Sequence, residues 1–402
     1  MPPRAEPDAC PGALRVHGAA DGGLARVRVP GGRLDARQVR ALAAAAELGD
    51  GGWELTSRAN LQVRGLAPRV VAEFADRLAD AGLLPSPTHE RVRNIIASPY
   101  TGCDDAGSLD VHAVSVELDR RLRAAPALAE LPGRFLFTVD DGRGDVGGLA
   151  ADVGLRPDGD AVAVLLSGAD KGIRVAAPDA PRAAVLAAEA FLAERARQES
   201  ASWRLAELTD GADRVARRVL AELGATSEAA ERALSPTDRV PATHADLGIL
   251  HRRGGRASLA LGAPLGRLNA EQVALLAAQH RPLRLTPWRT LLLTDIPERA
   301  AGTLLSDMDE AGFVVDPAAP LAGVTACTGR PGCAKSLADV RSDAVRVARP
   351  GALPVHWAGC SRRCGRPAGR GVEVLATEAG YEVGGEPAGE LSAALEAARR
   401  AV

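Results

Sequence analysis

The sequence predicts an α+β protein built from one unit that occurs twice along the chain. Residues 31–43 (GGRLDARQVRALA) resemble residues 265–277 (LGRLNAEQVALLA), and LTSRANLQVRGL from residue 55 resembles LTPWRTLLLTDI from residue 285, at an offset of 230. The strand and helix signals run in the same order in both copies, β-α-β-β-α. One such unit leaves a sheet with a poorly covered face, so we expect the two copies to pack together as one domain.

Each element of the repeat has its own local signal. Asp35 and Asn269 are candidate helix N-caps, and the glutamine three residues after each predicts a capping box. The second helix of each copy is expected to end at Gly82 or Gly312, because glycine suits the left-handed conformation that follows a helix. Strands are expected at LARVRV (24–29), WELT (53–56) and LQVRG (61–65) in the first copy, and at ASLAL (257–261), LRLT (283–286) and TLLLT (290–294) in the second.

The rest of the chain completes two further lobes. VAVLLSG (162–168) predicts a strand, residues 181–198 and 202–223 predict helices, and the polar segment 224–245 with its two prolines predicts a linker. We therefore expect repeat 1 at 15–88, a first (substrate-side) lobe at 89–240, repeat 2 at 246–316 and a second lobe at 320–402.

Composition limits the kind of partner. The net charge of −2 offers no attraction for nucleic acid or an anionic membrane, and no apolar run approaches the ~20 residues that span a bilayer. The N-terminus, MPPRAEPDACPGALRV, has no apolar stretch typical of a signal peptide. We expect a cytoplasmic protein, in which clustered cysteines are more often metal ligands or catalytic thiols than disulfides.

Four of the six cysteines lie in two short loops near the C-terminus. They form a C-x5-C pair in TACTGRPGCAKS and, after a gap of 26 residues, a C-x3-C pair in HWAGCSRRCGRP: Cys327, Cys333, Cys360 and Cys364. Four thiolates can hold an iron–sulfur cluster or a structural zinc. The C-x5-C spacing is wide for a zinc knuckle, which favours the cluster, and coincidence is the weakest alternative. This lobe is therefore expected to carry the metal.

The first copy differs at the corresponding positions. At the offset of 230, Cys103 falls on Cys333 and Ala97 on Cys327. We expect Cys103 to be a small buried residue and Cys10 to be incidental. The region equivalent to C-x3-C reads FLFTVDDGRGD and carries Asp140, Asp141 and Asp145. These acids could bind a metal or handle a proton, and a solvated turn is an equal alternative.

These motifs resemble the sulfite/nitrite reductase superfamily over nearly the whole chain. LARVRVPGGRL, ELTSRANLQVRG and RNIIASPYTG are similar to its first lobe, and the cysteine spacing is similar to its second. The resemblance implies a duplicated fold in which two half-ferredoxin-like units form one domain with two α+β lobes. It implies a [4Fe–4S] cluster on the four cysteines, and Cys364 matches the cysteine that also bridges to sirohaem in the reductases.

The resemblance also implies a tetrapyrrole site. Substrate-binding residues would be Arg26, Arg28, Arg58, Arg93, Asn94 and Arg134, and catalytic residues would be Arg93, Arg134, Asp140 and Asp141. Arginine forks bind carboxylates bidentately, and tetrapyrroles bear many carboxylates. We expect Arg26 and Arg28 to occupy alternate positions of one strand and to face the same way.

One departure favours a particular branch of the superfamily. Sulfite reductases carry two lysines that clamp the anion, and LPGRFLFTV places Arg134 and Leu136 there. A leucine cannot bind an anion, which disfavours sulfite or nitrite reduction. RNIIASP, FLFTVDDG, TACTGRPGCA and GCSRRCGRP are similar to the precorrin-3B synthases in particular. The resemblance then implies a monooxygenase of aerobic cobalamin biosynthesis, with precorrin-3A and dioxygen as substrates; the alternative is a sirohaem-dependent sulfite or nitrite reductase.

Other cofactors and partners follow from the same resemblance. The family is associated with a non-haem iron, but the seven histidines form no 2-His-1-carboxylate pattern: His17, His89, His112, His244, His251, His280 and His356. A dinucleotide-binding glycine fingerprint is also missing, so electrons would come from an external donor or reductase. We expect a monomer, because the duplication already supplies an internal pair. A non-catalytic electron carrier is a weaker third hypothesis.

Overall fold

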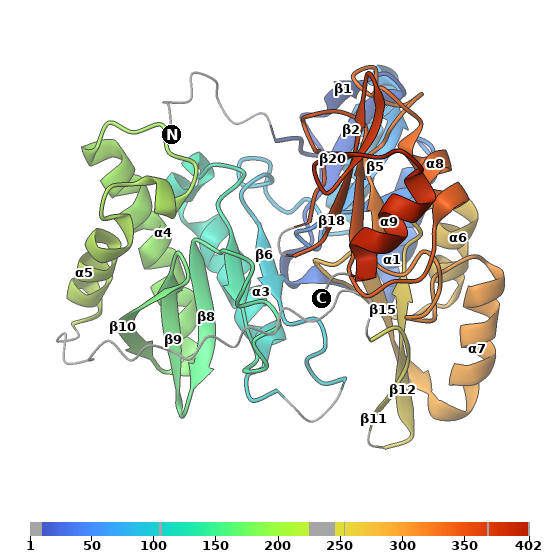
Figure 1. Cartoon of the computed structure of the whole chain (residues 1–402). Coiled ribbons are helices and arrows are strands. Elements are labelled where there is room, and N and C mark those ends of the chain that lie inside the picture. The colour runs from blue at the N-terminus through green and yellow to red at the C-terminus, as the bar shows by residue number, and fades with distance from the viewer. Residues whose placement is uncertain (1–9, 104–106, 225–245, 253, 368–369, 401–402) are drawn as a thin grey trace. The chain divides into compact units, whose positions relative to one another are not determined.

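The computed structural model describes residues 10–103, 107–224, 246–252, 254–367 and 370–400, and it divides into two compact units (Figure 1). Unit 1 takes in 1–12, 28–32 and 84–240, and unit 2 takes in 13–27, 33–83 and 241–402. Within the described residues, none of the helices is both long and apolar enough to cross a bilayer.

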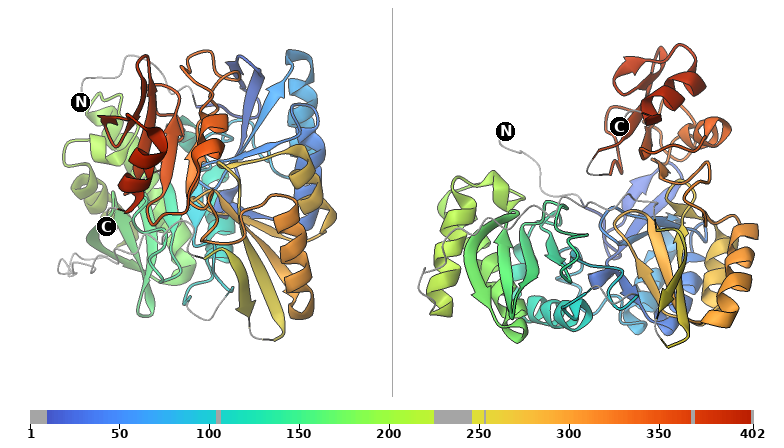
Figure 2. Two further views of the ribbon diagram at one scale, coloured as in Figure 1. Left: turned by 45° about the vertical axis from the view of Figure 1, so that its right-hand side comes forward. Right: turned by 60° about the horizontal axis from the view of Figure 1, so that its bottom comes forward.

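Unit 2 contains both copies of the repeat. Copy one comprises β1 (His17–Ala19), β2 (Gly22–Val27), β3 (Arg33–Leu34), α1 (Ala36–Ala46), β4 (Trp53–Leu55), β5 (Leu61–Leu66) and α2 (Val71–Asp80). Copy two comprises β11 (Gly248–Arg252), β12 (Arg256–Gly262), β13 (Arg267–Leu268), α6 (Ala270–Ala278), β14 (Leu283–Leu285), β15 (Thr290–Pro297) and α7 (Glu298–Glu310). Helices of both copies line the same side of the two sheets (Figure 2).

The two copies exchange a short strand. β13 of copy two pairs with β4 of copy one, and β3 of copy one pairs with β14 of copy two, so each sheet ends on a strand from the other copy. The pairs Leu268↔Trp53 and Leu34↔Leu283 are equivalent, which makes the exchange reciprocal. This confirms that the repeats form one domain, and the exchange covers one edge of each sheet, at β4 and at β14, with a strand from the other copy.

The helix ends predicted for the two copies of the repeat are confirmed. Asp35 and Asn269 both cap through a complete capping box, accepting from the backbone N–H of the glutamine at N3. α2 and α7 end just before Gly82 and Gly312, whose φ angles of 72° and 80° lie in the left-handed region. The same local chemistry therefore sets the helix ends in both copies.

Each unit also contains a lobe with a mixed sheet, and the two lobes share one topology. In unit 1 the sheet contains β6 (Ile95–Ala97), β7 (Phe137–Val139), β8 (Val153–Asp158), β9 (Ala161–Leu166) and β10 (Ala169–Val175). In unit 2 it contains β16 (Val324–Ala326), β17 (Val355–Ala358), β18 (Val372–Thr377), β19 (Gly380–Val383) and β20 (Glu386–Pro387). The first three strands of each sheet are parallel and the last two antiparallel, so the duplication extends into the lobes.

Helices follow the same plan. α3 (Val111–Ala124) connects β6 to β7, and α8 (Val340–Val347) connects β16 to β17. The unit 1 lobe adds α4 (Ala180–Arg197) and α5 (Gly211–Leu223), and the unit 2 lobe ends with α9 (Leu391–Arg400). Phe135 stacks on Phe191 with ring centroids 4.9 Å apart at the centre of the unit 1 core, and Trp357 packs edge-on against Tyr381 at 5.4 Å in the other lobe.

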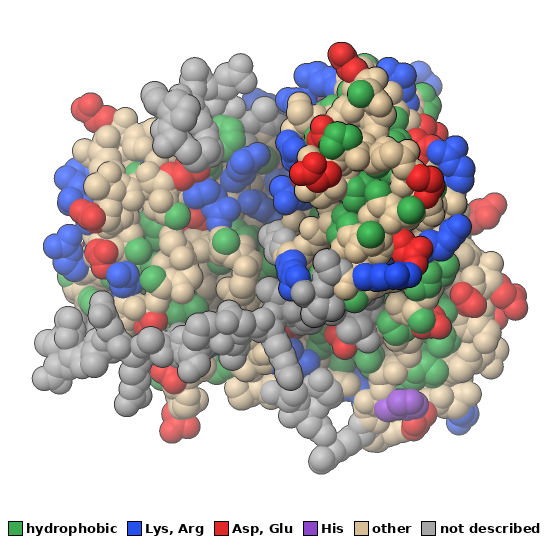
Figure 3. All heavy atoms as spheres, viewed as in Figure 1, with side chains coloured by type: hydrophobic (Ala, Val, Ile, Leu, Met, Phe, Trp, Pro, Cys, Tyr) green, Lys and Arg blue, Asp and Glu red, His purple; other side chains and the backbone are tan. Residues whose placement is uncertain are grey.

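Two local predictions are wrong. The helix predicted at 202–223 begins only at Gly211, because Asp210 adopts a left-handed φ of 50° that interrupts the helix. Arg28 does not share a strand with Arg26, since β2 ends at Val27 and Arg28 belongs to unit 1. The predicted linker lies in residues 225–245, outside the described residues, apart from Gly224. Acidic and basic side chains are interspersed over the face shown in Figure 3, in keeping with the small net charge.

Candidate functional site

The four cysteines of unit 2 come from two loops at one edge of a sheet. Cys327 directly follows β16, and Cys360 lies two residues after β17. These strands are parallel neighbours, with Ala326 opposite Trp357, so both chains leave the sheet at the same end. The Cys327 N–H donates to the Trp357 carbonyl at 2.9 Å, and the Gly359 N–H donates to Cys327 Sγ at 3.1 Å. The sheet therefore brings the C-x5-C and C-x3-C loops together.

Further hydrogen bonds hold the loops to each other. The Leu337 N–H donates to the Gly359 carbonyl at 2.8 Å, and the Cys333 N–H donates to the Gly329 carbonyl at 2.8 Å. Gly359 has no room for a side chain, since a Cβ there would lie 1.9 Å from Ser336 Oγ and 3.5 Å from Cys327 Sγ. Glycine at this position lets the backbone approach the sulfur closely.

Two buried side chains bind backbone carbonyls of the loop that carries Cys364. His356 Nε2 lies 3.2 Å from the Cys364 carbonyl, and Arg289 donates to the Gly365 carbonyl. Burial lowers the pKa of His356 to about 3, helped by the Arg289 charge, so its imidazole is neutral. Because a carbonyl only accepts, Nε2 carries the ring proton, and Nδ1 faces Thr325 Oγ1 at 2.9 Å.

The arrangement of thiols fits a cluster with several irons. Burial raises the pKa of the Cys364 thiol, and the nearness of Cys327, Cys360 and Cys333 raises it further, so the four sulfurs share one neighbourhood. Yet no three of these four described sulfurs lie within 4.8 Å of one another. Zn–S bonds of about 2.3 Å would bring tetrahedral sulfurs to about 3.8 Å, whereas thiolates of a four-iron cluster each bind a different iron and stand farther apart.

The lobe of unit 1 has an acidic site at the equivalent place. Its ladder pairs Ala97 with Val139, as Ala326 pairs with Trp357, so Ser98 takes the position of Cys327. The hydrogen bonds agree: the Asp141 N–H donates to Ser98 Oγ at 3.0 Å, as the Gly359 N–H donates to Cys327 Sγ. We call Asp140, Asp141 and Asp145 the acidic triad. One oxygen from each of the three lies within 4.8 Å of the others.

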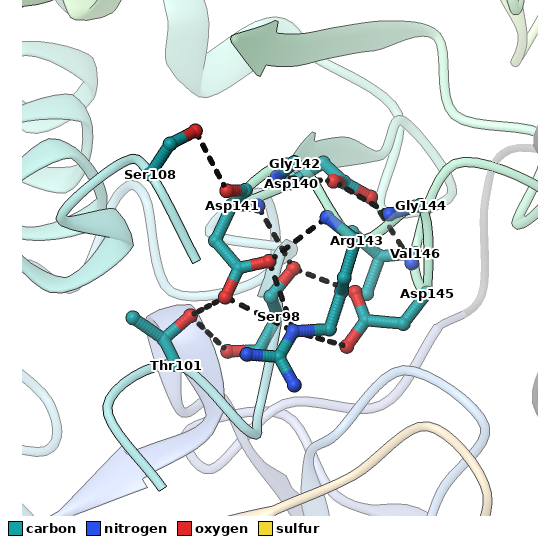
Figure 4. Close-up of polar contacts among 10 residues, drawn as sticks. All are labelled: Ser98, Thr101, Ser108, Asp140, Asp141, Gly142, Arg143, Gly144, Asp145 and Val146. Atoms are coloured by element: carbon teal, nitrogen blue, oxygen red, sulfur yellow. Dashed lines mark hydrogen bonds and ion pairs between the residues drawn. The ribbon is translucent and has the colours of Figure 1, made fainter. Parts of the chain in front are cut away.

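Polar partners surround most oxygens of the acidic triad (Figure 4). Asp140 accepts from the backbone N–H groups of Gly142 and Gly144 at 2.8 and 2.9 Å. Asp141 accepts from Thr101 Oγ1 at 2.7 Å and from Arg143 Nε at 3.0 Å.

Asp145 is the member of the acidic triad whose negative charge has the fewest hydrogen-bond donors around it. Its Oδ1 accepts from Ser98 Oγ at 2.6 Å, while Oδ2 makes no hydrogen bond and has only Arg143 Nε at 4.0 Å. Burial, followed by the negative charges of Asp140 and Asp141, raises the pKa of Asp145 to about 7. One carboxyl of the triad therefore holds a proton near neutral pH.

Three sequence-based expectations about this lobe have an outcome. The acidic triad is 0–3% exposed, so the solvated-turn alternative is wrong: the turn is held inward by the bonds just described. The match of Ala97 with Cys327 is also wrong, because the lobes are related by an offset of 229 at this strand, one residue less than the repeat. Cys103 is 2% exposed and confirms the expectation of a small buried residue.

Three of the predicted substrate residues are engaged inside unit 1. Arg93 is 4% exposed and forms a bidentate ion pair with Asp119, with N···O distances of 2.6 and 3.1 Å. Asn94 donates through Nδ2 to the Gly133 carbonyl at 2.9 Å, and Arg28 donates to the Arg91 carbonyl at 3.3 Å. These contacts fasten the segment before β6.

The other three predicted substrate residues are more accessible. Arg134 of unit 1 is exposed and lies over the Trp203 ring, 5.2 Å from its centroid. Arg58 and Arg26 of unit 2 are half-buried. With the Gln62 amide oriented to satisfy its neighbours, its oxygen accepts from Arg26 at 2.6 and 3.1 Å. The five predicted arginines are thus divided between the two units. Unit 1 contains Arg28, Arg93 and Arg134, and unit 2 contains Arg26 and Arg58.

Histidines contribute no metal set among the described residues, where the acidic triad is the one group of three or more ligand-type side chains this close together. His89 is buried against Ser86 and Thr88, and His251 pairs with Glu298 at 2.9 Å on the surface. His244 lies outside the described residues.

Known proteins with a similar sequence indicate which family this architecture belongs to. The family model for the nitrite/sulfite reductase ferredoxin-like half domain matches residues 17–81. The ferredoxin–nitrite reductase of Synechococcus elongatus is 29% identical over 86% of this chain and 74% of its own length. A precorrin-3B synthase from a Sinorhizobium species is 26% identical over 93% of this chain and 81% of its own. The chain belongs to the nitrite/sulfite reductase superfamily.

A solved structure supports the same fold for this superfamily member. NirA of Mycobacterium tuberculosis aligns with a TM-score of 0.72 and 20% identity, covering 90% of this chain and 73% of its own. The duplicated α+β fold predicted from the sequence is therefore confirmed.

Sequence reasoning missed several charged residues beside the thiol loops of this superfamily member. Glu54, Arg64, Arg289 and Arg341 are half-buried or buried; the first three are remote from the cysteines in sequence, whereas Arg341 lies on the helix between the two cysteine loops. A charged residue within an apolar strand, such as Glu54 in GGWELT, was a signal that could have drawn attention to it. Ser98 carried no such signal, because only the strand register reveals its equivalence to Cys327.

Proposed function

We propose that this chain is an oxidoreductase that hydroxylates precorrin-3A with dioxygen and closes a lactone, the activity of a precorrin-3B synthase. The observation that carries the choice is Leu136. The resemblance puts this residue where sulfite reductases carry an anion-binding lysine, and here its side chain is 3% exposed and packs with Ile96, Val146 and Ala151. A buried leucine supplies no charge to an anionic substrate.

The thiol loops support the redox part of the proposal. Cys327, Cys333, Cys360 and Cys364 would hold a [4Fe–4S] cluster, which transfers electrons one at a time from an external donor. The precorrin-3B synthase relative, which aligns with 93% of this chain, supports the same activity.

Substrate contacts are proposed from the accessible arginines. Arg26, Arg58 and Arg134 would bind carboxylates of the tetrapyrrole, since a guanidinium fork matches a carboxylate. Arg28, Arg93 and Asn94 would instead hold the segment before β6 in place, because their polar groups already bind within unit 1. Asp140 and Asp141 would keep a proton on Asp145 Oδ2 available near neutral pH.

Among the described residues no histidine set is available to hold a non-haem iron, and the acidic triad is the candidate ligand group. It offers oxygen donors alone, which suit hard cations better than the usual non-haem iron triad. We also propose a monomer that works in the cytoplasm, where thiols remain reduced.

The second candidate is a sirohaem-dependent nitrite or sulfite reductase. The specific observation in its favour is the 29% identity to the Synechococcus elongatus ferredoxin–nitrite reductase. Anaerobically purified protein separates the two. The synthase should contain iron and sulfide, show cluster absorbance without sirohaem bands, and consume precorrin-3A only with dioxygen. Extractable sirohaem together with loss of nitrite or sulfite under reduced methyl viologen would overturn the proposal.

A further inference from the structure

Three arginines of unit 2 reach the backbone of the cysteine loops from other elements. They come from β5, from the turn between β14 and β15, and from α8. Their guanidinium groups donate to carbonyls at three points of the two loops: Arg341 Nε to Cys327 at 3.2 Å, Arg64 Nη2 to Gly332 at 3.4 Å, and Arg289 Nη2 to Gly365. We call Arg64, Arg289 and Arg341 the arginine cradle.

A buried carboxylate joins two members of the arginine cradle, Arg64 and Arg341. Glu54 of β4 is 9% exposed, and its oxygens lie 3.2 Å from Arg341 Nη2 and 3.9 Å from Arg64 Nη1. Asp21 adds a bidentate pair to Arg64, with both N···O distances 2.8 Å. Glu54 and Asp21 therefore compensate Arg64 and Arg341, whereas none of the ion pairs of the described residues includes Arg289, whose guanidinium lies beside the Cys364 loop.

Burial makes this charge effective. Arg64 is 4% exposed and Arg289 is 7% exposed, so water screens them little. An arginine side chain stays protonated at neutral pH in proteins, so Arg289 and Arg341 both carry a positive charge beside the loops.

We propose that the arginine cradle, anchored by Glu54, positions both cysteine loops and makes the iron–sulfur cluster easier to reduce. The inference rests on the cluster of the proposed function. One electron from an external one-electron reductant enters the cluster and makes it more negative. A buried cation nearby stabilises the reduced form more than the oxidised form.

Two charge-opposed variants test this. The holoprotein is titrated with dithionite and redox mediators, and the reduced cluster is followed by electron paramagnetic resonance. Arg341→Gln should make reduction about tenfold less favourable, about 59 mV for one electron, and Glu54→Gln should shift the potential the opposite way. Arg346→Gln is the matched control on the same helix, because Arg346 is 70% exposed and pairs only with Asp343 among its recorded ion pairs; its shift should stay below about twofold.

Each outcome decides the inference. If Arg341→Gln and Glu54→Gln shift the potential the same way, or neither shifts it, the charge argument is overturned. If Arg341→Gln fails to retain the cluster, Arg341→Lys takes its place, because lysine keeps the positive charge and should keep the reduction potential. A shift in reduction potential no larger than that of Arg346→Gln supports the proposal. A larger shift refutes it. Wild-type protein without iron and sulfide would instead refute the proposed function.

Discussion

Replacing Asp145 by asparagine should stabilise the protein, and only above about pH 4. The folded state keeps Asp145 protonated up to about pH 7, against an ordinary pKa of 3.8, because the carboxyl is buried beside Asp140 and Asp141. In the unfolded chain the same carboxyl ionises near pH 4. The wild-type free energy of unfolding therefore falls as the pH rises from 4 to 7, and it stays at the lower level above pH 7. Asparagine has the same shape and no proton to lose.

The magnitude follows from the shift. About three pKa units at 1.36 kcal/mol each set a ceiling of about 4 kcal/mol, and relaxation of the site should leave about 2 kcal/mol or more. For a unit of this size that corresponds to an increase of about 4–8 °C in melting temperature at pH 8. Circular dichroism melts from pH 4 to 8.5, with a chelator present, measure the difference between variant and wild type.

The matched control is Asp160→Asn, which changes an exposed acid in the turn between β8 and β9. Its melting temperature should follow that of the wild type at every pH. A difference for Asp145→Asn that does not change with pH, or an asparagine variant less stable than wild type at pH 8, would refute the reasoning about the buried carboxyl.

Three other predictions concern single side chains. Cys333→Ser should lose cluster absorbance and iron, whereas Cys103→Ser should retain both; equal iron content in the two variants would contradict the assignment of the thiol loops. Arg93→Ala should lower the free energy of unfolding by about 3 kcal/mol, because it leaves the buried carboxylate of Asp119 with one cation fewer beside it. Chemical denaturation measures this free energy. A loss below about 1 kcal/mol would contradict a structural role for the ion pair. Asp35→Ala should cost about 1 kcal/mol through its capping box, measured in the same way, and no loss would contradict the cap.

Much of the fold could be predicted because its signals are local. The capping boxes at Asp35 and Asn269 and the glycines at 82 and 312 depend on residues within one helical turn, so both copies could be compared position by position. The reciprocal exchange of β3 and β13 could not, since each strand is two residues long and its partner lies in the other copy. No local pattern marks such a pair.

Candidate site residues divide in the same way. The two cysteine pairs identify themselves, because short spacings between thiols are rare without a ligand. Arg26 and Arg28 were expected on one face of one strand, but β2 ends between them and the two residues belong to different units. The end of a strand depends on its pairing partner, which sequence alone does not reveal.

By itself the sequence determined the duplication, the helix ends of the repeat and the grouping of four cysteines in two short loops, since these depend on residues near one another or on repeated patterns. Only the tertiary structure decided that Ser98 stands in the place of Cys327, that the acidic triad is buried, and that Glu54 contacts arginines from two separate elements, β5 and α8. Burial and long-range charge pairing arise when distant segments pack together and exclude water, and that packing is where the remaining information lies.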